Sequence, residues 1–256
     1  MKKDKLDRAF DDLIDVIDQK NLKNYVAIVL DRSGSMQNMR REAVDMFNEQ
    51  VDALQKSTGE MKTFVSLVTF ASQVDEPEIW CEDVAKFPKF SHSDYNPKGG
   101  TALRDAIGKT IQKFESMDAS KDPNSSFLII AITDGDENSS IDFSSSRLAE
   151  LIQSMQETKR WTFSYIGTDR DFSKITKETN IHIGNVMACS YASSSMSSGP
   201  SRSPSMSSNI SRGIDNYMSG RAMGMTSTNN MYEGCVSNEN ITVGNADNTT
   251  KEEEKK

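Results

Sequence analysis

The sequence predicts an α/β fold, in which a doubly wound, mostly parallel central sheet with one antiparallel edge strand carries helices on both faces. Strand-length apolar runs alternate with amphipathic segments of helical spacing between residues 24 and 190. Helical segments of ten or more residues between the runs provide the crossovers that parallel strands need. The run at 74–81 contains Pro77, and a proline within a strand favours the edge of a sheet.

Each expected element has its own signal. The first helix of the domain, at 39–57, gathers Ala43, Met46, Phe47, Val51 and Leu54 on one side. The run SFLIIAIT at 126–133 is the most apolar in the chain, which indicates a central strand. The other strands are expected at 24–30, 63–71, 161–167 and 183–190, and the other helices at 101–117, 146–160 and 171–180.

The domain, expected over residues 23–191, has an extension at each end. Residues 1–22 carry apolar side chains at helical spacing on one face, so this amphipathic helix either lies on the core or docks on a partner. After Tyr191 the composition changes, and more than half of the residues at 192–212 are serine. Such a segment cannot bury enough apolar surface to offset the entropy of ordering. We therefore expect a Ser- and Met-rich, largely flexible region over 192–256, with a short helix near 210–222.

Composition limits the class of protein and its partners. The 256 residues carry a net charge of -8, and the sequence shows no basic stripe, so nucleic acid is not an expected partner. No apolar run is long enough to span a membrane, and the N-terminus lacks the apolar core of a signal peptide. The cysteines Cys81, Cys189 and Cys235 are odd in number and far apart, as expected of reduced thiols. These features predict a cytoplasmic protein without a membrane partner.

Oxygen-bearing side chains follow two of the expected strands and open one expected helix. Parallel strands bring their carboxyl ends to one edge of a sheet, where ligands bind. Carboxylates and hydroxyls suit Mg²⁺, with Mn²⁺ and Ca²⁺ as alternatives, better than they suit zinc or copper. The candidates are Asp31, Ser33 and Ser35 after the first strand, Thr101 before a helix, and Asp134 after the central strand.

Simpler interpretations exist for each residue taken singly. Asp31 could cap the helix that follows it, and Thr101 is a natural N-cap. The stretch DGDENSSIDFSS begins like an EF-hand calcium loop, but Ser139 and Ser145 stand where that loop needs a glycine and a glutamate. Glu137 and its neighbour Asp136 are then expected to be charges at the rim of the site.

Taken together, the motifs Asp-x-Ser-x-Ser, Gly-Gly-Thr and Thr-Asp-Gly resemble the metal-ion-dependent adhesion site of the von Willebrand factor A domain. The resemblance covers roughly Asn24 to Tyr191. It implies that the hydroxyls of Ser33 and Ser35 bind Mg²⁺ directly and that Thr101 binds it directly or through a water. Asp31 and Asp134 would hold the waters of the ion and orient the serines. An aspartate or glutamate of a partner protein would complete the coordination.

The resemblance implies a metal-dependent protein-binding module and not an enzyme. Many bacterial and phage proteins with this fold serve as adaptors for an AAA+ ATPase or a multi-protein assembly, which makes either a candidate partner here, although nothing in the sequence names it. The alternative is a metal-dependent hydrolase or phosphatase that uses the same ion. Against it, the only histidines are His92 and His182, and neither has an obvious place as a general base.

Overall fold

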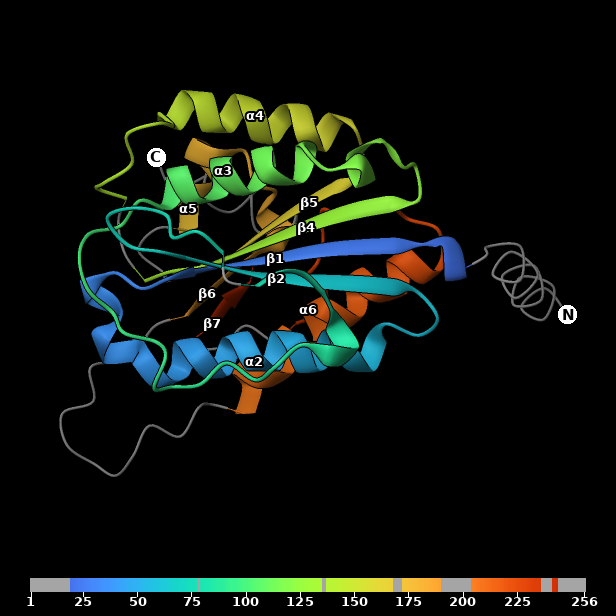
Figure 1. Cartoon of the computed structure of the whole chain (residues 1–256), viewed down its shortest axis with the longest axis horizontal. Coiled ribbons are helices and arrows are strands. Elements are labelled where there is room, and N and C mark those ends of the chain that lie inside the picture. The colour runs from blue at the N-terminus through green and yellow to red at the C-terminus, as the bar shows by residue number, and fades with distance from the viewer. Residues whose placement is uncertain are drawn as a thin grey trace, which may run out of the picture.

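The computed structural model describes residues 19–77, 79–134, 137–167, 172–189, 204–235 and 241–243, and these form a three-layer α/β structure (Figure 1). The central sheet has seven strands in the order β3-β2-β1-β4-β5-β6-β7. The strands are β1 (Lys23–Asp31), β2 (Lys62–Phe70), β3 (Ile79–Asp83), β4 (Ser125–Ile132), β5 (Trp161–Gly167), β6 (Val186–Cys189) and β7 (Ile241–Val243). The α-helices are α2 (Arg40–Ser57), α3 (Leu103–Glu115), α4 (Ser145–Glu157), α5 (Phe172–Thr179) and α6 (Pro204–Ala222).

The pairing of the strands confirms the predicted fold class. β1 pairs in parallel with β2 on one side and with β4 on the other, and β4, β5 and β6 continue in parallel. The order of the strands therefore reverses between β1 and β4, and such a switch point opens a crevice at the carboxyl ends of the strands. β3 is the expected antiparallel edge, and β7 adds a second antiparallel edge from a part of the chain where no strand was expected.

The edge strand β3 begins later than expected, so the prediction of a strand at 74–81 is wrong in its position. Pro77 precedes the strand and does not lie in it. The register between β2 and β3 shifts between Val65 and Leu67, and Cys81 has a positive φ of 54°. This irregularity shortens and twists the edge, which discourages pairing with another chain.

Each face of the sheet has its own hydrophobic core. Side chains alternate along β1, so that Val26, Ile28 and Leu30 face α2 and α6, whereas Ala27 and Val29 face α3 and α4. The α3 side is rich in stacked rings; one example is the pair Phe127 and Trp161, whose ring centroids lie 4.4 Å apart. Both faces of the middle strands are therefore buried, which explains their unbroken apolar runs.

Residues 204–235 differ from the flexible region that composition suggested, because they complete the core on the α2 side. α6 is longer than the helix expected at 210–222 and begins with Pro204, a residue suited to the first helical position. Gly213 does more than weaken the helix: a Cβ there would lie 2.5 Å from the ring of Tyr232. Composition missed the apolar residues that α6 and its continuation bury: Met206, Ile210, Ile214, Tyr217, Met218, Met231, Tyr232 and Cys235.

Some predictions lie outside the described residues. They include the amphipathic helix within 1–22, apart from Gln19–Asn21, which form a 3₁₀ helix, and the placement of Asp136. No helix in the described part of the chain combines the length and apolar character needed to cross a membrane. Cys81 and Cys235 are free thiols.

Candidate metal centre

The switch point between β1 and β4 brings together side chains that lie far apart in the sequence. Asp31 is the last residue of β1, and Asp134 follows the end of β4. The Ser35 Oγ donates a hydrogen bond to the Asp134 Oδ1 at 2.7 Å. The Ser33 Oγ lies 3.0 Å from the Ser35 Oγ, and the Ser33 amide donates to the Asp31 Oδ1 at 2.6 Å. Four of the five predicted residues are thus linked in one network.

Backbone hydrogen bonds bring the segment before α3 to the same rim. The Gly34 amide donates to the Gly99 carbonyl at 2.9 Å, which joins the loop at 31–35 to the segment that leads into Thr101. Gly99 has a φ of 83°, a left-handed conformation that glycine adopts without strain. Thr101 is buried, with 3% of its surface exposed. All five predicted residues therefore belong to one end of the sheet.

Helix capping does not explain the two residues for which it was the simpler interpretation. The N-cap of α2 is Met39, and that of α3 is Ala102; neither makes a side-chain capping bond. Asp31 accepts instead from the Ser33 amide and from the Thr133 Oγ1, the latter at 2.5 Å. Its carboxylate is turned toward the rim and not onto the end of a helix.

The two carboxylates are ionised less readily than free ones. Burial raises the pKa of Asp31 to about 6, although the hydrogen bonds from Thr133 and Ser33 oppose the rise and the charge of Asp134 adds to it. Burial also raises the pKa of Asp134, against the hydrogen bond from Ser35. A cation between two such groups would favour their ionised forms. The electrostatics of this rim therefore suit a positive ligand.

The chemistry of the donors fits a hard divalent cation. Among the described residues, no group of three or more His, Cys, Asp or Glu side chains could hold a metal ion, so the rim residues described here would use hydroxyls as well as carboxylates. Two carboxylates and three hydroxyls supply only oxygen, the ligand that Mg²⁺ and Ca²⁺ prefer. Asp31, Ser33 and Thr101 are buried, whereas Ser35 is exposed. An ion held here would keep one side open to solvent.

Residues that the sequence did not single out support the loop at 31–35, called the aspartate loop below. Thr133, although part of the Thr-Asp-Gly motif, had no expected role and donates to the Asp31 carboxylate. The Tyr95 hydroxyl donates to the Asp31 carbonyl. Arg32 forms a bidentate ion pair with Asp75, with both N···O distances at 2.5 Å. Only the folded chain reveals Tyr95 and Asp75, because each lies at least 40 residues from the loop in sequence.

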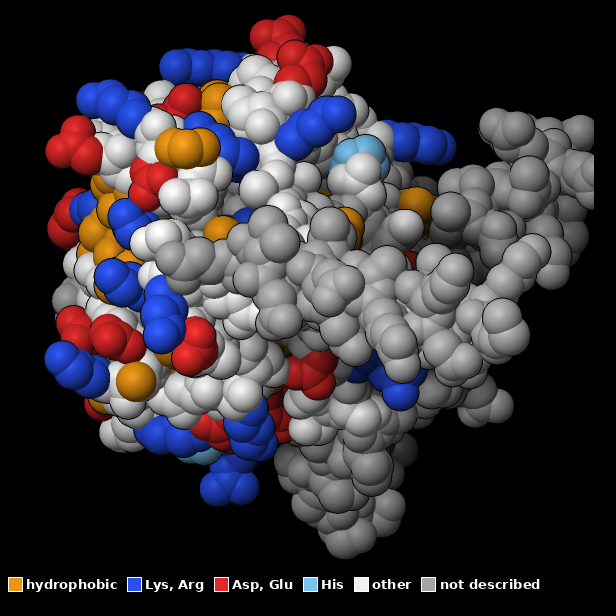
Figure 2. All heavy atoms as spheres, turned by 90° about the vertical axis from the view of Figure 1, so that its right-hand side faces the viewer, with side chains coloured by type: hydrophobic (Ala, Val, Ile, Leu, Met, Phe, Trp, Pro, Cys, Tyr) orange, Lys and Arg blue, Asp and Glu red, His pale blue; other side chains and the backbone are white. Residues whose placement is uncertain are grey.

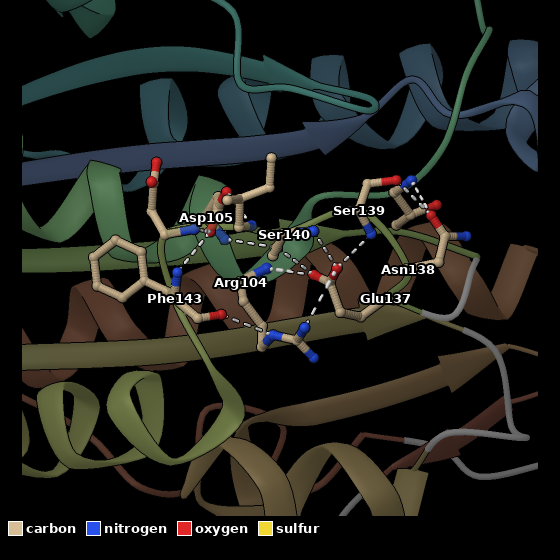
Figure 3. A network of polar contacts seen from close by, with 10 residues as sticks. Arg104, Asp105, Glu137, Asn138, Ser139, Ser140 and Phe143 are labelled. Atoms are coloured by element: carbon tan, nitrogen blue, oxygen red, sulfur yellow. Dashed lines mark hydrogen bonds and ion pairs between the residues drawn. The ribbon is translucent and has the colours of Figure 1, made fainter.

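The expectation that Glu137 is a charge at the rim is wrong. Its side chain is 9% exposed and accepts hydrogen bonds from the amides of Arg104, Ser139 and Ser140 at 2.8–2.9 Å (Figure 3). The neighbouring Asn138 Oδ1 accepts from the Thr101 amide at 2.9 Å. These bonds fasten the loop after β4 to the start of α3 and fix the backbone of Thr101.

A second carboxylate continues this network away from the rim (Figure 3). Asp105 is 5% exposed and accepts from the amides of Ile141, Asp142 and Phe143 at 2.9–3.0 Å. The loop is held rigidly, yet it leaves Ile141 86% exposed. An apolar side chain presented in this way is suited to contact with another molecule.

The rim borders a cleft of about 720 Å³ beside β3. Arg32 and Tyr95, which flank and support the aspartate loop, form part of its wall, and Phe87 and Phe90 supply aromatic surface. His92 lies in the same segment between β3 and α3 as Phe90 and Tyr95, but it pairs with Asp45 of α2, at 3.1 Å between Nε2 and Oδ1.

The family model of the von Willebrand factor type A domain matches residues 26–198, which is more than half of the chain. The chain belongs to the von Willebrand factor type A domain family. The match covers β1 to β6, and it therefore includes the whole rim and leaves out α6.

Solved structures resemble the chain at low sequence identity. A von Willebrand factor type A protein from Catenulispora acidiphila is 18% identical, with a TM-score of 0.50 over 79% of this chain and 43% of that protein. Manganese-loaded TRAP protein from Plasmodium vivax is 20% identical, with a TM-score of 0.41 over 57% of both chains. An aerotolerance-related membrane protein from Bacteroides fragilis is 18% identical, with a TM-score of 0.39 over 57% of this chain and 67% of that protein.

The chain spans less than half of the first of these proteins, and that likeness concerns the fold alone. No curated protein matches the sequence.

Proposed function

We propose that this protein is a metal-dependent protein-binding module, in which a divalent cation at the carboxyl end of β1 and β4 binds a carboxylate of a partner. The family is often involved in metal-dependent protein interactions. The observation that carries the proposal is the contact between the exposed Ser35 and Asp134 beside the buried Asp31. It joins neutral hydroxyls to two carboxylates on a surface that another protein can reach.

Each side chain would have a separate task. The hydroxyl oxygens of Ser33, Ser35 and Thr101 would hold the ion, because a hydroxyl that donates to a carboxylate keeps its lone pairs for a cation. Asp31 and Asp134 would orient those hydroxyls and balance the charge. Mg²⁺ is the expected ion. With mostly neutral ligands it retains the Lewis acidity to bind an aspartate or glutamate of the partner.

Features beside the rim favour binding over turnover. The exposed Ile141 and the cleft lined by Arg32 and Tyr95 add surface beside the rim. A hydrolase would need a general base near the ion, and the side-chain hydrogen bond of His92 joins it to Asp45 of α2 and not to a rim residue. We therefore favour an adaptor within a protein assembly over a metal-dependent hydrolase.

A magnesium titration of thermal stability tests the metal site. A ligand that binds only the native state stabilises it by about 2.7 kcal/mol at one hundred times its Kd. We expect this gain in the wild type, and its loss in Ser33→Ala. The control Ser93→Ala changes an exposed serine whose Oγ pairs with Ser91 and leaves the rim intact. An equal gain in Ser33→Ala would contradict the site.

A second experiment tests the partner carboxylate. Proteins captured by the wild type in Mg²⁺ should be released by chelator and should not be captured by Ser33→Ala. Conversion of acidic residues to amides in a captured protein should then identify one whose loss ends binding. Capture that survives both chelator and Ser33→Ala would place the interaction elsewhere on the molecule.

A further inference from the structure

A buried arginine lies at the opposite end of the sheet from the rim, where β1 begins. Arg221, in the last turn of α6, is 1% exposed. Its Nε donates to the Asn24 Oδ1 at 2.7 Å, and one Nη donates to the Met225 carbonyl at 2.8 Å. The other Nη donates to the carbonyls of Asn124 at 3.0 Å and Lys23 at 3.4 Å. All four acceptors are neutral.

The charge of this arginine has no anionic partner among the described residues, where no carboxylate lies within ion-pair distance of Arg221. A guanidinium does not lose its proton in a protein, so Arg221 is a buried cation. Burial lowers its pKa, which shows that the site disfavours the charge. Buried cations are normally paired with anions, because neutral acceptors replace only part of the lost hydration. The surface at this end mixes both signs of charge (Figure 2), so Arg221 is not part of a basic patch.

Two hydrogen-bond donors remain unused beside this charge. A guanidinium has five N–H groups, and the hydrogen bonds of Arg221 account for four of them. Tyr217, one turn earlier in α6, is 2% exposed, and its hydroxyl makes no hydrogen bond with the described residues. The Ser126 hydroxyl is near enough to lower the pKa of Tyr217 a little, but it lies outside hydrogen-bond geometry and donates its own proton to the Thr226 carbonyl. Burial raises the pKa of Tyr217 to about 12, so this hydroxyl keeps its proton at neutral pH.

Both side chains line a small cavity of about 30 Å³ between α6 and the segment around Ser227. A cavity of this size has room for one water molecule or one small ion. The cavity has some contact with solvent at Met225 and Ser227, which gives an ion a way in and out.

We propose that this cavity binds one small monovalent anion, such as chloride, between the Arg221 guanidinium and the Tyr217 hydroxyl. An anion accepts hydrogen bonds from both unused donors and neutralises the buried cation, whereas a water does only the first. The bound anion would stabilise the attachment of α6 to the start of β1 and to Asn124 before β4. This site is independent of the metal centre at the other end of the sheet.

Thermal unfolding in sodium chloride and in sodium gluconate of equal ionic strength tests the proposal, with a fixed amount of magnesium sulfate in both. Gluconate is too large for the cavity. At ten times its Kd, chloride should raise the ratio of folded to unfolded wild-type protein about tenfold, and the midpoint by about 3 °C. The gain should saturate as chloride increases.

Two variants separate a specific site from a general salt effect. Tyr217→Phe removes one donor and keeps the arginine, so the gain from chloride should fall at least severalfold. Tyr232→Phe changes another buried tyrosine, whose hydroxyl lies 3.0 Å from the Ser164 Oγ, and should keep the full gain.

Crystals grown in bromide should show an anomalous peak beside the Arg221 guanidinium. Equal midpoints in chloride and gluconate, an equal gain in Tyr217→Phe, or a water without anomalous signal in the cavity would each overturn the proposal.

Discussion

Two buried carboxylates, Asp31 and Asp105, lie at the same end of the sheet and have opposite surroundings. Asp105 accepts three backbone amides of one loop, which satisfy it with donors that cannot move away. Asp31 accepts one amide and one hydroxyl, and it lies beside serine hydroxyls and a second carboxylate. Burial alone therefore does not distinguish a structural carboxylate from a binding one. What distinguishes them is the number of fixed hydrogen-bond donors around the carboxylate and the presence of neighbouring groups that can coordinate a cation.

The comparison predicts its largest effect for Asp105→Ala. This change leaves three amides without their acceptor and should lower the free energy of unfolding by about 3 kcal/mol. The stabilisation by Mg²⁺ should persist, because Asp105 holds residues 141–143 and not the rim. Urea unfolding with and without Mg²⁺ measures both quantities. Asp142→Ala, which removes an exposed ion pair with Lys109, is the control and should change stability by less than about 0.5 kcal/mol. A comparable loss in the control would contradict the structural role of Asp105.

In metal-free protein, Asp31→Asn should change the free energy of unfolding in the opposite direction. Burial raises the pKa of Asp31 to about 6, so at neutral pH the folded protein carries a carboxylate that its surroundings disfavour. A neutral amide should therefore raise the free energy of unfolding by about 2 kcal/mol. The same variant should gain nothing from Mg²⁺. Urea unfolding in chelator and in Mg²⁺ measures both effects. A loss of stability in chelator would mean that Asp31, like Asp105, is a structural carboxylate.

The smallest predicted effect is that of Thr133→Val, which removes one of the two hydrogen bonds to Asp31 and keeps the shape of the side chain. We expect the free energy of unfolding to change by about 1 kcal/mol and the affinity for Mg²⁺ to be several-fold weaker. Calorimetric titration of Mg²⁺ measures the affinity. An unchanged affinity would mean that the orientation of Asp31 does not depend on Thr133.

The sequence was informative where a residue acts next to its own strand, and much less so where its partner lies far away. The apolar run of β1, followed by Asp31 and Ser33, locates both the strand and the rim, because the carboxyl ends of parallel strands meet. The expectation that Glu137 is a rim charge is wrong partly because one of the three amides that it accepts from belongs to Arg104, more than 30 residues away. Pattern and spacing carry no information about which amides a carboxylate will meet.

The region after Tyr191 shows a different limit. Its serine content dominated the composition and indicated flexibility. The apolar residues that matter, from Met206 to Met218, recur at intervals of three or four. This spacing marks one face of a helix, and the average over the segment conceals it. The apolar face of α6 is buried only because α2 packs against it, and the sequence alone does not show that α2 has a surface left for this contact.

The docking of α6 has a consequence for how the protein is made. Ser57, the last residue of α2, bonds to Asp215 in α6, and Arg221 reaches back to the start of β1. On the ribosome, β1 and α2 therefore emerge long before the helix that covers them, and the nascent chain exposes that apolar surface until residue 235 has left the exit tunnel. A gene shortened at residue 198, where the family match ends, would encode a protein that keeps every rim residue and lacks the cover of its own core.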